Sequence, residues 1–400
     1  MGAGAATRLA IDGGSPVRPT YLPYAHQVVS DDDVAAVTEA LRSDWLTTGP
    51  RVPAFEALLA GVTGAKHAVA FSSGTAALHG AAVAAGLGPG DEAITTPMTF
   101  VATANAVLYA GATPRFADVT PDDLLIETSA VEAAITPATK AILAVDYAGQ
   151  PADYEALRRI ADAAPARRLT LIADAAHSLG ATRGGRRVGT LADLTVLSLH
   201  PAKIVTTGEG GAVLTDRDDL AETLRRFRNH GISSELAERR DWTYAMVELG
   251  YNYRLTDIAA ALGSSQIRRL DEFLARRRAL AARYLDRLAD HPAVELPVIA
   301  ADTDPAWHFL FARLRLDRIR VDRGTVFRAL RAENIGVNVH YIPVHTHPFY
   351  RERYPGVEIP VAEAQYERLL TLPLHAGMTD GDLDDVVSAL DKVTEAYMRA

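Results

Sequence analysis

Three separate segments of the chain combine residue types that can bind and activate a small phosphorylated ligand. The first is Ser72-Ser73-Gly74-Thr75, which follows an apolar run and opens an alanine-rich stretch. Such a segment predicts a strand, a tight turn and the first turn of a helix, whose unpaired amides and dipole bind anions, most naturally phosphate. Serine and threonine are also ordinary helix caps, so this segment alone leaves both interpretations open.

The second and third segments carry a carboxylate and an amine. Asp174 ends an apolar run, and a carboxylate buried there needs a cationic or donor partner, such as a protonated ring nitrogen. An aspartate that caps a helix is the simpler interpretation of that position alone. Lys203 follows Ser198-Leu199-His200 and precedes a glycine-rich stretch. Most lysines are solvated, but one in a partly desolvated pocket has a lowered pKa and becomes an amine nucleophile.

Together the three segments fit one ligand, pyridoxal phosphate. Its phosphate needs a helix start, its pyridine nitrogen needs an acidic partner that keeps it protonated, and its aldehyde needs a lysine amine. The glycines of Gly208-Glu209-Gly210-Gly211 do not open a helix as a GxGxxG motif would, which disfavours a dinucleotide.

The elements that must position these residues follow an alternating pattern. Short β-branched runs alternate with helix-like stretches over the first two thirds of the chain, which predicts an α/β fold with a mainly parallel central sheet. The predicted strands are 67–71, 92–95, 113–118, 140–146, 168–174, 195–199 and 212–215, with helices at 75–85, 101–110 and 152–163. Ligands of such sheets bind at the carboxyl ends of the strands, where the three segments lie.

The pattern changes after residue 255, and we divide the chain accordingly. The division is an N-terminal arm (1–23), a large cofactor-binding α/β domain (24–255), a connecting long helix (256–288) and a smaller C-terminal α+β domain (289–400). Thr256 and Asp257 are expected to cap the connecting helix. In the small domain the predicted order is strand 309–316, helix 321–333, strand 335–340 and helix 380–398. Residues 2–17 are expected to form a loose arm.

The composition narrows the class of protein. With 41 lysines and arginines against 50 aspartates and glutamates, the net charge of −9 offers no basic excess for binding nucleic acid. Cysteine is absent, which excludes disulfides, thiol nucleophiles and cysteine metal sites. No long apolar run and no targeting segment is found, so we expect a cytoplasmic protein that binds no membrane. His340, His345 and His347 do not share a helix face, so no metal site is predicted.

Six segments carry a close resemblance to a known enzyme family. They are SSGTAALHGAAVAAGLGPGDEAITTPMTFVATANAV, YAGQPADY, ADAAHSLGA, SLHPAKIVTTGEGGAV, RNHGI and LGYNYRLTDIAAALGSSQ. From about Tyr24 to Met378 the chain resembles the sugar-nucleotide aminotransferases of the DegT/StrS type. The resemblance implies a fold-type I pyridoxal-phosphate-dependent transferase that takes an amino-acid donor and a nucleotide-sugar substrate. It also implies a homodimer whose subunits share their active sites.

The resemblance further implies a role for each matching residue. Lys203 would bind the aldehyde of the cofactor covalently and carry protons, and Asp174 would pair with the pyridinium nitrogen. The phosphate and ring of the cofactor would be held by Ser73, Gly74, Thr75, Phe100, His177, Ser198 and, from the other subunit, Asn252. The substrate pocket would be lined by Tyr24, Asp44, Trp45, Leu46, Thr47, His340, Tyr341, Ile342 and Pro343. Ordinary packing remains an alternative for Phe100, Tyr24 and Trp45.

Within the family, the segments SDWLTTGP, SLHPAKIVTTGEGG and VNVHYIPVHTHPFYR most resemble the members of the pseudaminic-acid pathway. That resemblance implies transfer of an amino group, expected from L-glutamate, to C4 of a UDP-linked 4-keto-6-deoxy-N-acetylhexosamine. The product would be UDP-4-amino-4,6-dideoxy-N-acetyl-β-L-altrosamine. A dTDP- or GDP-linked keto sugar or a keto-cyclitol of natural-product biosynthesis is an alternative substrate, and a non-catalytic regulatory protein that binds the cofactor is an alternative class. Lys203 argues against the dehydratase branch of the family, in which histidine replaces the lysine.

Overall fold

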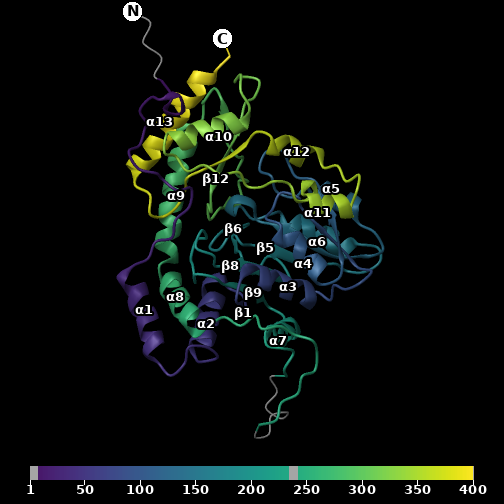
Figure 1. The fold of residues 1–400 in the computed structure, drawn as a ribbon. Helices are drawn as coiled ribbons and strands as arrows, with labels where there is room; N and C mark the ends of the chain where they lie inside the picture. The colour runs from purple at the N-terminus through teal and green to yellow at the C-terminus, as the bar shows by residue number, and fades with distance from the viewer. Residues whose placement is uncertain (1–7, 234–241, 400) are drawn as a thin grey trace, which may run out of the picture.

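The centre of the molecule is a seven-stranded sheet, seen in a computed structural model that describes residues 8–233 and 242–399 (Figure 1). Across the sheet the order is β1 (His67–Phe71), β9 (Gly211–Thr215), β8 (Leu194–Ser198), β5 (Thr170–Asp174), β4 (Thr139–Val145), β2 (Glu92–Thr95) and β3 (Thr113–Phe116). The strands from β3 to β8 are parallel to their neighbours, whereas β9 is antiparallel to both β8 and β1. The predicted mainly parallel sheet is therefore confirmed.

Alternate residues of each strand point to opposite faces of this sheet, and helices cover both. In β1, Val69 and Phe71 belong to one apolar cluster, while Ala68 and Ala70 belong to another. The first face carries α3 (Gly74–Ala84), α4 (Ala102–Tyr109) and α7 (Asp218–Phe227). The opposite face carries α2 (Arg51–Thr63), α5 (Thr128–Ala134), α6 (Tyr154–Ala163) and α8 (Asp257–Arg268). Burial on both sides explains why the strands appear in the sequence as continuous apolar runs.

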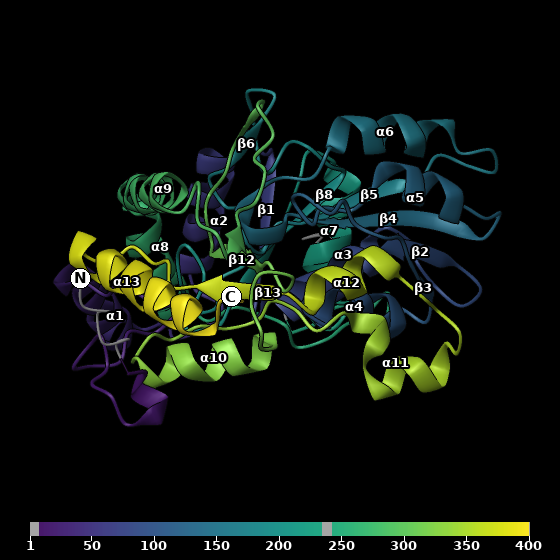
Figure 2. The same cartoon turned by 90° about the horizontal axis from the view of Figure 1, so that it is seen from above.

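A second apolar core lies in the C-terminal part of the chain. Its sheet consists of β10 (Val294–Glu295), β12 (Leu310–Leu314) and β13 (Leu369–Leu372), all antiparallel. The helices that pack on it are α9 (Leu270–Arg287), α10 (Arg323–Ala332) and α13 (Asp380–Tyr397), of which α10 and α13 lie beside β12 and β13 in Figure 2. None of the helices in the described ranges is long and apolar enough to cross a membrane.

The remaining elements are short, apart from one helix near the N-terminus. They are α1 (Asp31–Arg42), α11 (Pro348–Arg353), α12 (Pro360–Tyr366), the strands β6 (Thr182–Arg183), β7 (Arg186–Arg187) and β11 (Thr303–Asp304), and the turns η1 (Ala10–Asp12), η2 (Tyr147–Gly149) and η4 (Val344–Thr346). The strands β11, β6 and β7 form a small antiparallel sheet.

The helix expected over 256–288 is divided in two. Thr256 caps α8 as predicted, since its hydroxyl accepts a hydrogen bond from the amide of Ala259 at 3.1 Å. Arg269 leaves the helical conformation, with φ −102° and ψ 11°, and its amide donates to the carbonyl of Gln266. This hydrogen bond to the third residue before it is of the 3-10 type, and it ends α8 before α9 begins at Leu270.

The strand predicted over 335–340 is not formed. Ile335 makes a single bridge to Leu22 on one side, and Asn338 makes a single bridge to Thr371 of β13 on the other. Because the segment pairs with two different partners at isolated points, it builds no continuous ladder. Instead, β13 pairs with β12 in the small sheet, and the sequence pattern does not indicate β13.

The N-terminal residues from Arg8 onward are packed, which contradicts the expectation of a loose arm for that part. Leu9 is only 3% exposed and joins the core of the C-terminal sheet. The amides of Ala10 and Val17 each donate to the carboxylate of Glu333 at 2.9 Å, so the segment is held at two points. The first seven residues lie outside the described ranges.

Candidate active site

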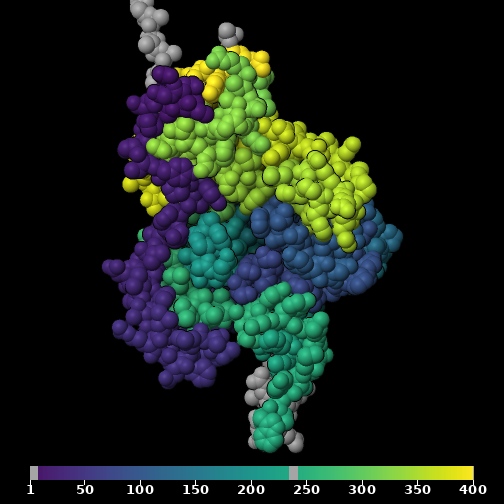
Figure 3. All heavy atoms as spheres, viewed as in Figure 1, coloured from purple at the N-terminus to yellow at the C-terminus, as the bar shows by residue number. Residues whose placement is uncertain are grey.

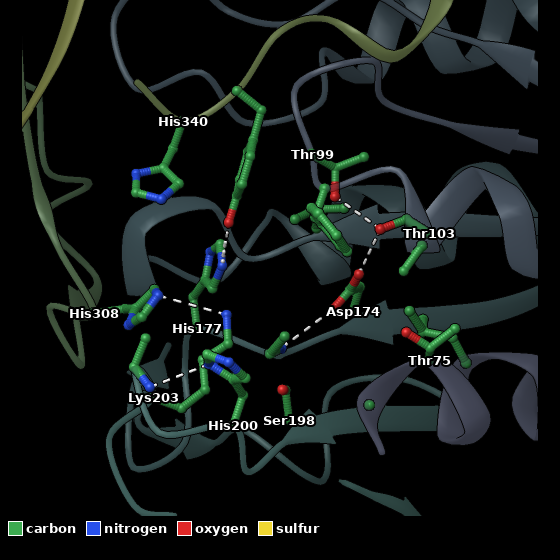
Figure 4. Close-up of a pocket in the computed structure, with 18 of the residues that line it drawn as sticks. Thr75, Thr99, Thr103, Asp174, His177, Ser198, His200, Lys203, His308 and His340 are labelled. Atoms are coloured by element: carbon green, nitrogen blue, oxygen red, sulfur yellow. Dashed lines mark hydrogen bonds between the residues drawn. The ribbon is translucent and has the colours of Figure 1, made fainter. Parts of the chain in front are cut away.

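A cavity of ≈ 560 Å³ opens at the carboxyl ends of β5 and β8, where ligands of parallel sheets bind (Figure 4). Residues from segments far apart in the sequence line it. Those that the sequence indicated and that lie on its wall are Tyr24, Ser73, Gly74, Thr75, Phe100, Asp174, His177, Ser198, Lys203, His340 and Tyr341. The three segments that the sequence singles out for their chemistry therefore line the same cavity.

The start of α3 forms the first wall of the cavity. Ser73 caps the helix, its hydroxyl accepting a hydrogen bond from the amide of Ala76 at 3.1 Å. Gly74 is needed here because a Cβ at this position would lie 3.0 Å from Cβ and 3.1 Å from Oγ of Ser198. A Cβ on Gly211 would likewise lie 2.5 Å from the carbonyl oxygen of Ser73. The start of α3 and the hydroxyl of Ser198 therefore lie side by side on the cavity wall. The free amides of a helix start can bind an anion there.

Asp174 ends β5 with its carboxylate buried. Its Oδ2 accepts a hydrogen bond from the hydroxyl of Thr103 at 2.7 Å, and its Oδ1 accepts one from the amide of Ala176 at 3.2 Å. Thr103 also lies 2.7 Å from the hydroxyl of Thr99, so the orientation of the carboxylate is fixed from α4. Burial raises the pKa of Asp174, because desolvation disfavours the charged form more than these donors stabilise it. A cationic ring nitrogen in the cavity would compensate that desolvation.

Lys203 lies in the loop that follows β8. Its backbone amide donates to the carbonyl of His200 at 2.8 Å, and Lys203 lines the cavity with its Nζ 3.5 Å from Nε2 of His308. Burial lowers the pKa of the Lys203 amine to about 8, although the negative charge of Asp174 opposes that effect. About one amine in ten is therefore neutral at pH 7, which makes Lys203 a usable nucleophile and proton acceptor.

Three histidines and a tyrosine form the wall next to Lys203. His177 stacks on His308 with ring centroids 4.5 Å apart, and its Nε2 lies 3.0 Å from the hydroxyl of Tyr341. His340 binds the hydroxyl of Thr371 through Nδ1 at 2.9 Å. Burial lowers the pKa of all three imidazoles, to about 3 for His340, with the charge of Lys203 as a further cause. The rings are therefore neutral at physiological pH.

Some sequence-indicated residues lie outside this cavity. Asn252 forms an isolated backbone bridge with Asn229, and the rings of Tyr251 and Tyr253 on either side of it stack at 5.0 Å. The others outside the lining are Asp44, Trp45, Leu46 and Thr47, next to the start of α8, and Ile342 and Pro343, beyond the histidine wall. Trp45, Leu46 and Ile342 are exposed.

The structure also adds residues that sequence reasoning missed. Thr103 contacts Asp174 and His308 contacts Lys203, and Asn338 lines the cavity with its Nδ2 3.5 Å from Nε2 of His340. Thr103 could have been found, because it lies in the first turn of the helix expected over 101–110, four residues after Thr99 in a segment already indicated. His308 belongs to no motif and comes next to Lys203 only through the packing of the C-terminal part.

An amine with a lowered pKa, a buried carboxylate and an anion-binding helix start in one cavity of an α/β fold define the class of pyridoxal-phosphate-dependent enzymes. The chain belongs to the DegT/DnrJ/EryC1/StrS aminotransferase family, whose model matches residues 27–391. It is therefore an aminotransferase, and the fold class and the dependence on pyridoxal phosphate expected from the sequence are confirmed by this family.

Individual relatives cover nearly the whole chain. The spore coat polysaccharide biosynthesis protein SpsC of Bacillus subtilis is 39% identical over 385 residues, covering 94% of this chain and 98% of its own length. The structure of Helicobacter pylori PseC, an aminotransferase involved in the biosynthesis of pseudaminic acid, is similar with a TM-score of 0.88 and 30% identity, over 94% of this chain and all of that one. The sugar aminotransferase Spr1654 of Streptococcus pneumoniae, in its PLP form, has a TM-score of 0.88 and 28% identity, over 95% of this chain and all of that one.

The residues around the cavity fit the cofactor of this family. Because Gly74 has no Cβ, the start of α3 approaches Ser198 closely, and both line the cavity, where together they would hold a phosphate group. The buried Nδ1 of His177 has no hydrogen-bond partner among the described residues, so a polar group of a ligand would satisfy it. Asp174 provides a carboxylate that would pair with the protonated ring nitrogen, and Lys203 provides an amine that would bind the aldehyde.

Proposed function

We propose that this sugar aminotransferase transfers an amino group from L-glutamate to C4 of a UDP-linked 4-keto-6-deoxy-N-acetylhexosamine, in the cytoplasm. The observation that carries the proposal is the shared cavity of Lys203, Asp174 and the start of α3. Its volume lies within the usual range for sites that enclose a small ligand. The choice of sugar is supported by the similarity to PseC and by the segment from Val337 to Arg351.

Each residue of the cavity has a task in this proposal. Pyridoxal phosphate, when bound, supplies an aldehyde that accepts the amino group and a ring that stabilises negative charge at the reacting carbon. Gly74, Thr75 and Ser198 would hold its phosphate, and Asp174 would keep the ring nitrogen protonated. Lys203 Nζ would bind the aldehyde and, when released, take a proton from the reacting carbon and return it.

The histidine wall would support this proton transfer. Since His177 and His308 remain neutral, they place no second cation beside the amine and leave Lys203 as the basic group of the site. Phe100 lines the cavity but is 58% exposed, which is compatible with a ring that would be covered by the cofactor.

The proposal includes a homodimer with shared active sites. Residues 242–249 belong to the connection between α7 and α8 and extend away from the body of the molecule (Figure 3). Their side chains Trp242 and Leu249 are 86% and 76% exposed, and Tyr244, Met246 and Val247 are exposed as well. So many exposed apolar side chains in one segment are typical of an interface. Asn252 follows closely and, as the family resemblance implies, would reach the cofactor of a second subunit.

A substrate panel tests this function. The purified protein with L-glutamate would be given UDP-, dTDP- and GDP-linked 4-keto-6-deoxy sugars, and mass spectrometry would detect the amino sugar. The proposal expects amine formation with the UDP-linked N-acetylhexosamine at the highest kcat/KM. Preference for a dTDP- or GDP-linked sugar would overturn the substrate assignment. Stoichiometric 2-oxoglutarate from L-glutamate without any sugar would separate an aminotransferase from a protein that only binds the cofactor.

A further inference from the structure

The amine of Lys203 contacts one buried side chain that has no part in the proposed binding of the cofactor. Its Nζ lies 3.5 Å from Nε2 of His308, and His308 is buried with only 3% of its surface exposed. The other ring nitrogen, Nδ1, is buried and has no hydrogen-bond partner among the described residues. A buried imidazole usually has partners for its polar atoms, so among the described residues the contact with Lys203 is the one hydrogen bond that orients this ring.

His308 is held in place from three sides. Arg277 of α9 is buried, and its Nη1 donates to the carbonyls of Trp307, His308 and Leu374 at 3.1, 3.0 and 3.0 Å. The ring of His177 stacks on one face of the imidazole, and Phe309 meets it edge-on at 5.2 Å. The backbone of His308 and the plane of its ring are therefore fixed, and Nε2 faces the amine of Lys203.

The groups that face His308 keep it uncharged. Lys203 from the loop after β8, His177 from the loop after β5, Arg277 from α9 and His340 from the segment before η4 are all cationic or neutral. Burial first, and then the positive charges of these neighbours, lower the pKa of His308 well below its ordinary value. A neutral imidazole can accept a hydrogen bond from the amine and cannot repel it.

We propose that His308 is a positioning residue for Lys203, whose amine its neutral Nε2 holds at the cavity wall whenever that amine is not bound to the cofactor. The proposal rests on the role of Lys203 in the proposed function. An ammonium has only donors, so Nε2 must accept from it; a neutral amine can also accept from Nε2. The contact thus survives both protonation states, and the amine keeps its direction while its charge changes.

The test measures how the apoenzyme captures pyridoxal phosphate, without any sugar substrate. Bound cofactor is fixed with borohydride at short times, and the mass of the Lys203 peptide gives the rate at each pH. In His308→Leu the ammonium loses an acceptor, so the midpoint of the pH profile should fall by about one unit, a tenfold change in the protonation equilibrium. The rate on the high-pH plateau should fall about ten- to a hundredfold, because the amine is no longer directed.

Two further variants separate the hydrogen bond from the fit of the ring. Glutamine places an amide where Nε2 stands, so His308→Gln should restore the wild-type midpoint and most of the plateau rate. Asparagine is shorter and does not reach Nζ, so His308→Asn should behave like the leucine variant; this pair decides the matter even where the leucine variant does not fold. His291→Gln is the matched control, since His291 is also buried but binds Asp391 at 3.1 Å and is not among the residues that line the cavity.

Wild-type profiles in both His308→Leu and His308→Asn would overturn the proposal, as would equal impairment of the glutamine and asparagine variants. Failure of this inference differs from failure of the proposed function. If wild-type Lys203 is labelled and the variants do not differ from it, only the role of His308 is refuted. If wild-type Lys203 is not labelled, the assignment of Lys203 itself falls.

Discussion

Replacing Gly74 by alanine should weaken binding of pyridoxal phosphate without unfolding the protein. The added Cβ would lie 3.0 Å from Cβ and 3.1 Å from Oγ of Ser198, whereas ordinary contacts begin at 3.4 Å. The first turn of α3 and the end of β8 must therefore separate by about 0.4 Å, the difference between these distances. Ser198 lies at the end of a central strand and cannot move freely, so the helix start must shift.

The expected effect follows from the hydrogen bonds that this shift would lengthen. The proposed phosphate site uses the amides at the start of α3 and the hydroxyl of Ser198 at once, and a separation of the two stretches and weakens at least one of these bonds. A hydrogen bond to a charged group contributes about 1.5–3 kcal/mol, which is the upper bound for its weakening. Since about 1.4 kcal/mol corresponds to a factor of ten, the Kd for the cofactor should rise several-fold, up to about a hundredfold.

The assay is a spectrophotometric titration of the apoenzyme with pyridoxal phosphate, accompanied by thermal unfolding. Gly61→Ala is the matched control: Gly61 lies within α2, and its Cβ would meet nothing within 4 Å. This control should raise the free energy of unfolding by about 0.5–1 kcal/mol and leave the Kd unchanged. A folded Gly74→Ala variant that binds the cofactor like the wild type would refute the placement of the phosphate between α3 and Ser198.

Three other predictions follow from the same structure. Asp174→Asn should keep the fold and the cofactor but slow the half-reaction with L-glutamate by at least about a hundredfold in stopped-flow measurements, since a positioned charge contributes several kcal/mol; near-wild-type rates would remove its role. Because burial lowers the pKa of Lys203 to about 8, and the amine is protonated below that pKa, cofactor capture by the apoenzyme should rise with pH and level off above about 8. A rise that continues to the ordinary lysine pKa of about 10.4 would show a solvated amine. Leu249→Asp should convert the proposed dimer into a monomer in sedimentation experiments, whereas Val298→Asp, at another exposed apolar position, should not. A dimer in both variants would contradict the proposed interface.

The sequence predicts the large sheet well because its strands are buried on both faces. The observed bounds of β1 and β2 are those predicted, and most of the other strands differ by one or two residues at their ends. Asp174, Ser198 and Lys203 could be assigned to one edge of the sheet, since the carboxyl ends of parallel strands meet there.

The C-terminal part is predicted less accurately, because isolated bridges and side-chain packing, which leave no periodic pattern in the sequence, shape it. The segment 335–340 has the composition of a strand, yet its bridges go to Leu22 and Thr371, which lie far away in the sequence. Arg269 interrupts the expected connecting helix although no glycine or proline is present there. His308 meets Lys203 only after the small sheet has packed against the large one, and no pattern in the sequence reports such a contact.

The most direct test of the account uses the scarcity of lysine in this chain. It has four lysines, and three of them pair with carboxylates: Lys66 with Asp218, Lys140 with Asp91 and Lys392 with Glu333. Borohydride reduction of the holoenzyme followed by peptide mass spectrometry should place the cofactor on Lys203 alone, and Lys203→Ala should carry none. A label on one of the other three lysines, or full turnover by Lys203→Ala, would contradict the account.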